Sequence, residues 1–201
     1  MSTCLVGSEM CIRDRGLVSE VFSRDEYLEF EGNQAIGHVR YTTAGDSGLL
    51  NAQPLVFRYT GGQVAVAHNG NLVNAKRLRD QLERQGSIFQ TNSDTEVVSH
   101  LIARAGPPID HAFQDALRVI DGAYALLLMT EKQMIAAQDP RGFRPLSLGQ
   151  FENAWVVSSE TCALNTIGAD FVCEIKPGEL LVFDEKGLHM RSFTGVQTRK
   201  I

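Results

Sequence analysis

The sequence predicts an α+β fold in which packed sheets carry helices on their outer surfaces. Its 201 residues, 43% hydrophobic and 21% charged, are enough for one well-cored domain. Apolar residues recur at helical spacing along 72–85 and 93–106, whereas "AYALLLMT", "MIAAQD", "AWVVSSE" and "GELLVFDEKG" are short apolar runs separated by turn residues. Because continuous apolar runs are typical of strands covered on both faces, we expect sheets packed between helices.

Two strands and a helix are expected first. "AIGHVRYTT" (35–43) and "QVAVAHNG" (63–70) are strand-like, and "LVNAKRLRDQLERQG" (72–86) has the apolar spacing of a helix that ends at its glycine. His-Asn-Gly-Asn (68–71) interrupts the second strand with residues that favour turns. We therefore expect either a hairpin tip or a strand-to-helix turn, whose unpaired N–H groups would bind an anion or an oxyanion.

Two further helices precede the apolar runs. In "SDTEVVSHLIARAG" (93–106), Ser93 and Glu96 have the spacing of a capping box, and the apolar residues after them form one face that ends at Gly106. "HAFQDALRVIDG" (111–122) carries a similar apolar face. No internal repeat or low-complexity linker divides the chain, so we expect one domain.

Composition excludes several classes of protein. The formal net charge of -5 is mild and the Lys and Arg residues are scattered, so we expect neither nucleic acid nor a membrane as a partner. No apolar run has transmembrane length and no secretory leader opens the chain, which predicts a cytoplasmic location. Cys4, Cys11, Cys162 and Cys173 lack the spacing of a metal motif and are too few for a disulfide scaffold. Cys162 and Cys173 are expected to be buried thiols.

Three polar interruptions, around Arg40, His68 and Asp94, lie at the ends of apolar segments. Each has a structural explanation by itself: a salt-bridged arginine, a core histidine, and an aspartate favoured by a helix dipole. Together, a cation, a carboxylate and two donors suit an α-amino acid whose side-chain carbonyl is attacked. In that hypothesis Arg40 binds the α-carboxylate and Asp94 the α-ammonium group. Asn69 and Gly70 would stabilise the oxyanion.

Several separated motifs resemble those of class II glutamine amidotransferases. "GHVRYTTAG" (37–45), "AHNGNLVNA" (67–75) and "NSDTEVVSHLI" (92–102) are similar to the glutamine-binding segments of that family. The resemblance implies the N-terminal-nucleophile hydrolase fold, an αββα four-layer sandwich of mostly antiparallel sheets with helices 72–85 and 94–105 on one outer face. "GLVSEVF", "DPRGFRPLSLG" and "SSETCAL" narrow the resemblance to the amidophosphoribosyltransferase branch.

The resemblance also implies a role for each site residue. Arg40 and Thr43 would bind the carboxylate side of glutamine, and Asp94 its amino group. The side-chain amide of Asn69 and the backbone N–H of Gly70 would form the oxyanion hole, in which losing one donor costs a factor on the order of 10²–10³ in rate.

Parts of the family pattern are expected to be absent. The family's nucleophile is an N-terminal cysteine whose own amino group acts as the base. We interpret residues 1–15 as foreign sequence, 16–193 as the glutaminase domain without its first strand, and 194–201 as a truncated tail.

One functional hypothesis is the glutaminase domain of an amidophosphoribosyltransferase, which supplies ammonia for phosphoribosylamine formation in de novo purine synthesis. In that hypothesis this chain is itself inactive, because it lacks the cysteine. The alternatives are a non-catalytic glutamine-binding fragment, or the glutaminase of another class II enzyme such as glucosamine-6-phosphate synthase.

Partners and cofactors follow from the same resemblance. L-Glutamine is the expected substrate, a phosphoribosyltransferase domain outside this chain is the expected recipient of ammonia, and the intact parent is expected to be a homo-oligomer. Tyr41 resembles a residue that couples the two activities, although it would serve equally as a packing aromatic. No cofactor or metal is expected in this chain. Magnesium, and in one subgroup an iron–sulfur cluster, would belong to the rest of the parent.

Overall fold

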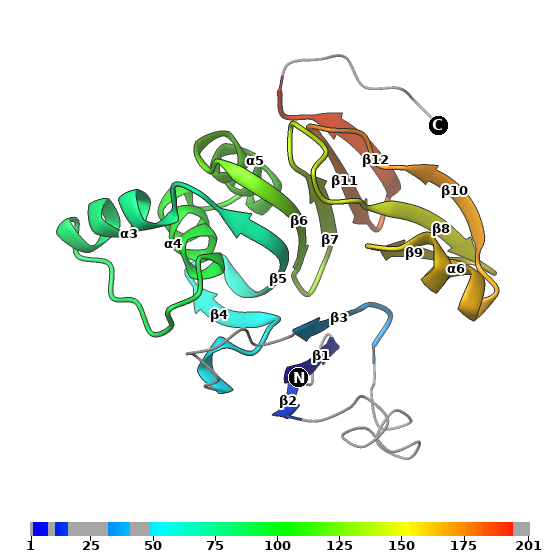
Figure 1. The fold of residues 1–201 in the computed structure, drawn as a ribbon, viewed down its shortest axis with the longest axis horizontal. Coiled ribbons are helices and arrows are strands. Elements are labelled where there is room, and N and C mark those ends of the chain that lie inside the picture. Colours follow the sequence, from blue (N-terminus) through cyan, green and yellow to red (C-terminus); the bar gives the residue numbers. More distant parts are fainter. Residues whose placement is uncertain (1, 8–10, 16–31, 41–48, 195–201) are drawn as a thin grey trace.

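The computed structural model describes residues 2–7, 11–15, 32–40 and 49–194, with the backbone alone for 2–7, 11–15, 40 and 49 (Figure 1). The elements within these ranges, in chain order, are β1 (Ser2–Gly7), β2 (Cys11–Arg15), β3 (Ala35–Arg40), the 3-10 helix η1 (Leu49–Asn51), β4 (Leu55–Tyr59), β5 (Gly62–Leu72), α3 (Ala75–Arg84), α4 (Thr95–Ala105), α5 (Ile109–Val119), β6 (Gly122–Met129), β7 (Met134–Gln138), β8 (Ser147–Phe151), β9 (Ala154–Ser158), α6 (Thr161–Ile167), β10 (Asp170–Glu174), β11 (Glu179–Asp184) and β12 (Gly187–Ser192).

A six-stranded antiparallel sheet with the order β12-β11-β7-β6-β5-β4 forms the centre of the fold. Side chains alternate across it, so that Val64 and Val66 of β5 face one side while Ala65 and Ala67 face the other. All four are buried, because other layers cover both faces of the sheet. The buried strands expected from the continuous apolar runs are confirmed for β6, β7 and β11, whereas β9, formed by "AWVVSSE", has no buried residue and is an edge strand.

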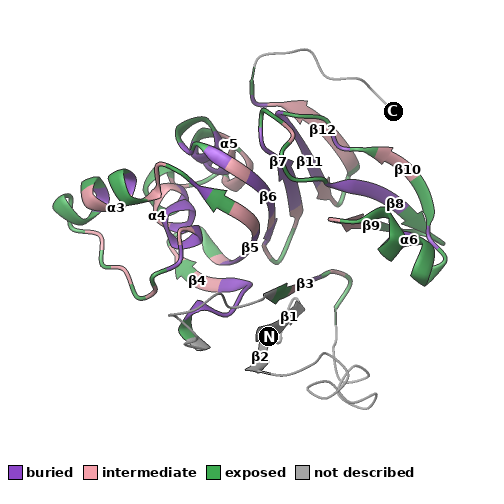
Figure 2. Ribbon diagram, viewed as in Figure 1, coloured by how far each residue is buried: buried purple, intermediate pink, exposed green. Residues whose placement is uncertain are grey.

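Helices α3, α4 and α5 cover one face of this sheet (Figures 1 and 2). Each helix buries apolar residues spaced three or four positions apart, as one face of an α-helix requires. The largest of them are Leu78 and Leu82 of α3, Val98 and Ile102 of α4, and Phe113 and Leu117 of α5. The prediction that the first two helices share one outer face is confirmed.

A second layer of strands covers the opposite face of the sheet. Strands β10, β8 and β9 form an antiparallel sheet in that order, and Leu146, Leu148 and Ile175 pack against Ala136 and Leu181 of the central sheet. Helix α6 lies on the far side of this layer and contacts β8, β9 and β10. The layers therefore follow the order helices, sheet, sheet, helix, which is the αββα arrangement that the sequence predicts.

The second layer has another part, the sheet β2-β1-β3, in which Ile36 of β3 packs on Ala65 and Ala67. Strands β3 and β9 are edge strands of their sheets, and both line a groove of about 1060 Å³. The groove is lined by neither Asn69 nor Asp94.

Strands β1 and β2 fall within the segment interpreted as foreign. The division at residues 15 and 193 and the absence of the family's first strand stay predictions.

The two cysteines whose side chains the structure describes differ from expectation. Cys162 is exposed on α6, because "TCALNTI" forms a short helix that buries Leu164 instead and ends at Gly168. Cys173 is partly buried in β10, and burial raises the pKa of its thiol. No helix in the described ranges is long and apolar enough to cross a membrane.

Candidate active site

His-Asn-Gly-Asn continues β5 instead of forming a turn, which corrects the expectation from its turn-favouring residues. Residues 68–72 pair with 126–122 of β6. The reason is close backbone approach: Gly70 has a φ of 150°, and a Cβ there would lie 2.0 Å from the carbonyl oxygen of Ala123. Glycine at this position therefore lets two strands pair where any other side chain would collide.

The backbone N–H of Gly70 points away from β6. Tyr124 lies opposite Gly70 in the register, yet its own N–H donates to Oδ2 of Asp139 at 3.3 Å, and its carbonyl accepts the Asp139 N–H at 2.9 Å. The backbone groups of Tyr124 are thus directed to the side away from β5. Gly70 and Tyr124 form a non-hydrogen-bonded pair of the antiparallel ladder, which directs the groups of Gly70 outward.

The same alternation directs the N–H groups of His68 and Leu72 to this open side of β5, beyond the end of β4. His68 N–H donates to Oε1 of Gln53 at 2.6 Å, and Leu72 N–H donates to Oδ2 of Asp94 at 2.8 Å. The N–H of Gly70 lies between these two, and no hydrogen-bond partner for it is found among the described residues. Of these three outward donors, the N–H of Gly70 is therefore the one for which the described part of the chain provides no acceptor.

Asp94 lies on the side of β5 to which Gly70 points. It stands just before α4, and its side chain is 24% exposed. Burial raises the pKa of its carboxyl, but interactions with the His68 ring and hydrogen bonds from the N–H groups of Leu72 and Thr95 outweigh burial, so the pKa is lowered. The carboxylate is therefore ionised at neutral pH, on the side of β5 to which the N–H of Gly70 points.

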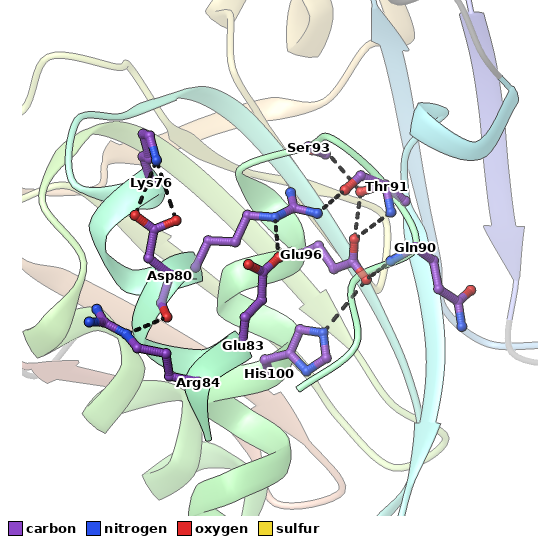
Figure 3. A network of polar contacts seen from close by, with 10 residues as sticks. Lys76, Asp80, Glu83, Arg84, Gln90, Thr91, Ser93, Glu96 and His100 are labelled. Carbon is purple, nitrogen blue, oxygen red and sulfur yellow. Dashed lines mark hydrogen bonds and ion pairs between the residues drawn. The ribbon is translucent and has the colours of Figure 1, made fainter. Parts of the chain in front are cut away.

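The loop before Asp94 is held by Glu96 and not by a capping box (Figure 3). The carboxylate of Glu96 accepts the N–H groups of Gln90 at 2.8 Å and Thr91 at 2.7 Å, and the hydroxyl of Thr91 at 2.8 Å. The hydroxyl oxygen of Ser93 accepts the backbone N–H of Thr95 at 3.3 Å, and not the N–H of Glu96 that a capping box requires. The spacing of Ser93 and Glu96 thus indicates the start of the helix correctly, but the hydrogen bonds of a capping box do not form. The Glu96 carboxylate binds residues 90 and 91 instead of the backbone N–H of Ser93.

Asn69 directs its side chain toward the second layer of strands, as Ala67 does two residues earlier. Its Nδ2 lies 3.5 Å from Oγ of Ser159, at the end of β9, within the "SSETCAL" motif. This is a weak bond by its length, so the amide remains able to donate elsewhere. Asn69 and Gly70 thus offer an amide and an N–H from consecutive positions of one strand.

The remaining predicted site residues fall outside the description. Thr43 and Tyr41 do so entirely, and Arg40 is described only as the last backbone position of β3. The convergence of Arg40 on Asp94 and the role of each residue stay predictions. The structure brings together Gly70 and Asp94, on one side of β5.

Sequence reasoning missed the buried polar group behind Asp94. Gln53 donates through Nε2 to the Thr95 hydroxyl at 3.2 Å, and Nδ1 of His68 lies 3.2 Å from the same oxygen. The sequence by itself offers a core histidine as one interpretation of His68, and nothing in the pattern around Gln53 indicates a contact with it. Among the described residues, no group of three or more His, Cys, Asp or Glu side chains is placed to hold a metal ion.

Residues 38–166, more than half of the chain, match a family model described as "Glutamine amidotransferase domain". The chain belongs to this glutamine amidotransferase family. It is 50% identical over 184 residues to the amidophosphoribosyltransferase of Bacillus subtilis (strain 168), a match that covers 90% of this chain and 39% of that protein. It is 53% identical over 175 residues to the chloroplastic amidophosphoribosyltransferase 2 of Arabidopsis thaliana, covering 86% of this chain and 31% of the relative. The chain thus spans less than two fifths of the length of either relative.

A solved structure is similar over nearly the whole chain. It is described as glutamine phosphoribosylpyrophosphate (PRPP) amidotransferase from B. subtilis complexed with ADP and GMP, and it matches 97% of this chain and 43% of its own at 45% identity and a TM-score of 0.90. The family of the chain, its similarity to this structure and its four layers all lead to one fold. It is the N-terminal-nucleophile hydrolase fold that the resemblance of the sequence motifs implies. The amidophosphoribosyltransferase branch suggested by "DPRGFRPLSLG" and "SSETCAL" is the branch of these relatives.

Proposed function

We propose that this domain binds L-glutamine and serves hydrolysis of its side-chain amide, releasing ammonia. The observation that carries the proposal is the backbone N–H of Gly70, for which the described residues supply no acceptor. It lies between the N–H groups of His68 and Leu72, which donate to side chains, and on the same side of β5 as the ionised Asp94. One donor for a developing negative charge and one carboxylate for an ammonium group are two of the groups that an attack on an amino acid's side-chain amide requires, and the attacking thiolate is the third.

The roles proposed for Gly70, Asn69 and Asp94 follow from this arrangement, and those of Arg40 and Thr43 from the resemblance to the family. Asp94 holds the α-ammonium group, and Arg40 and Thr43 bind the carboxylate side of glutamine. The N–H of Gly70 and the side-chain amide of Asn69 donate to the oxyanion that forms when a thiolate attacks the amide carbon. Donors already fixed in a strand need no reorganisation during the reaction, which is why a backbone position suits this task.

We further propose that the released ammonia is used by a phosphoribosyltransferase domain of the parent protein, as the first step of purine synthesis, and that Tyr41 couples the two activities. The names of the relatives and their greater length support this. The parent is proposed to be a cytoplasmic homo-oligomer that carries its magnesium, and any iron–sulfur cluster, in that other part.

Calorimetry with L-glutamine and with L-glutamate tests the first step. We expect the chain to bind L-glutamine, with Arg40→Ala and Asp94→Asn each weakening it, while Arg84→Ala on the exposed face of α3 serves as the matched control. Unchanged affinity in both site variants would overturn the proposed site.

A thiol-reactive glutamine analogue tests the second step. Covalent labelling that depends on Asp94 supports a catalytic domain, because the analogue must be held beside a thiolate to react. Glutamine binding without labelling or ammonia release would favour the alternative, a non-catalytic glutamine-binding fragment.

A further inference from the structure

His68 is almost wholly buried beside Asp94. Its side chain is 1% exposed, and Nδ1 lies 3.2 Å from Oγ1 of Thr95 and 3.5 Å from Oδ1 of Asp94. The other ring nitrogen, Nε2, is also buried and has no hydrogen-bond partner in the part of the chain that the structure describes. Buried polar atoms without partners are rare. A neutral imidazole carries its proton on one of its two nitrogens, so the groups around the ring decide which nitrogen is protonated.

Gln53 restricts what the Thr95 hydroxyl can do. Because the backbone N–H of His68 can only donate, the amide atom 2.6 Å from it is the Gln53 oxygen. Nε2 of Gln53 must then donate to Oγ1 of Thr95 at 3.2 Å. The hydroxyl keeps one proton of its own, which goes either to His68 or to Oδ1 of Asp94, 3.5 Å away.

With the partners that the described part of the chain provides, one arrangement of protons satisfies these buried groups best. With the ring proton on Nε2, a buried N–H would have no acceptor, and the Nδ1 lone pair would face the Asp94 carboxylate. With the proton on Nδ1, the ring donates toward Thr95 and Asp94, and the hydroxyl of Thr95 donates to Asp94. Only a nitrogen lone pair is then left without a partner, which costs less than an unpaired buried donor beside a repelled carboxylate.

We propose that His68 is a positioning residue: as the neutral tautomer protonated on Nδ1, it orients the Asp94 carboxylate toward the open side of β5 and leaves its charge for the ammonium group of an amino acid. A doubly protonated ring would cancel that charge and bury an unpaired N–H. The identity of the cation rests on the proposed function, whereas the tautomer and the orientation do not.

Two substitutions separate hydrogen bonding from packing. His68→Asn places an amide N–H near the position of Nδ1, whereas His68→Gln extends its amide toward the position of Nε2. We expect His68→Asn to keep the affinity for L-glutamine close to that of the unsubstituted chain. His68→Gln and His68→Ala should lower it roughly tenfold or more, because a hydrogen bond to a charged group is lost.

Nitrogen-15 NMR of the unsubstituted chain measures the tautomer directly and needs no variant to fold. A protonated Nδ1 with an unprotonated Nε2 is the expected result. Protonated Nε2 would overturn the proposal, and so would equal losses of affinity in folded His68→Asn and His68→Gln.

Failure of the proposed function has a different signature. In that case Asp94→Asn leaves the affinity for L-glutamine unchanged, while the ring still shows the Nδ1–H tautomer. A titration of the Asp94 carboxyl by carbon-13 NMR in the same variants needs no ligand. His68→Ala should raise the pKa of Asp94, and His68→Asn should not.

Discussion

The backbone N–H of Leu72 donates a 2.8 Å hydrogen bond to Oδ2 of Asp94, and this bond joins the end of β5 to the start of α4. It places a carboxylate from the helical layer next to the outward N–H of Gly70. Two segments more than twenty residues apart thereby present opposite kinds of group, an acceptor and a donor, on one side of a strand.

Asp94→Asn should weaken the binding of L-glutamine by roughly 1.5–3 kcal/mol, because a neutral amide cannot pair with the α-ammonium group. Calorimetry measures the change. Asp80→Asn is the matched control, since Asp80 is half exposed and forms an ion pair with Lys76 on the same helix, α3. Equal effects of the two substitutions would contradict the role of Asp94.

Arg40→Ala should weaken the same binding by roughly 2–5 kcal/mol, the usual result of leaving one partner of a buried charge pair alone. The comparison is Arg104→Ala, at an exposed arginine near the end of α4 that bonds Gln85. If both variants bind L-glutamine as the unsubstituted chain does, Arg40 has no part in the site.

Gly70→Ala should lower the free energy of unfolding by roughly 2–6 kcal/mol, because its methyl group would meet the Ala123 carbonyl oxygen and its φ is unfavourable. Gly62→Ala is a control on the same strand: its φ is 118°, but a Cβ there meets nothing within 4 Å. Urea unfolding should show the smaller loss for Gly62, of about 1–3 kcal/mol. Equal losses would mean that close approach to β6 is unimportant.

Asp139→Asn should destabilise the fold by about 3 kcal/mol, because a wholly buried carboxylate organises the turn of "DPRGFRPLSLG". It accepts hydrogen bonds from the backbone N–H groups of Tyr124, Arg141, Phe143 and Arg144. The side-chain NH2 group of an asparagine would face some of these N–H groups, and two donors cannot form a hydrogen bond with each other. Asp115→Asn, at an exposed pair on α5, should be nearly neutral in urea unfolding, and a neutral Asp139→Asn would refute this account.

The contribution of Asp94 to stability should depend on pH in one window. Folding lowers the pKa of this carboxyl, so the unfolded chain binds more protons as the pH nears 4, and stability there rises with pH. The contribution is present above the unfolded pKa and is lost as the pH falls through the lowered folded pKa. The difference in unfolding free energy between the unsubstituted chain and Asp94→Asn should therefore shrink below about pH 4. A difference that grows on acidification would show that the sign is wrong.

Much of the architecture could be predicted from residue patterns. Helical spacing indicated α3, α4 and α5, and continuous apolar runs indicated β6, β7 and β11, because burial on one or both faces leaves a periodic trace in the chain. The pattern failed at His-Asn-Gly-Asn, where glycine serves close strand pairing instead of a turn. It also failed at Cys162, because a seven-residue helix is too short to show a period.

The chain's own pattern, together with its family motifs, was sufficient for the fold class and the family, and it indicated Asn69, Gly70 and Asp94 as a candidate site at the ends of apolar segments. The tertiary structure decided which of their atoms are free. Within the described residues the N–H of Gly70 lacks an acceptor because Tyr124 is bound to Asp139, and the pKa of Asp94 is lowered although the residue is partly buried, because Leu72 and His68 reach it from another layer. Hydrogen bonds between residues far apart in the chain depend on register and layer packing, and neither leaves a local trace in a single sequence.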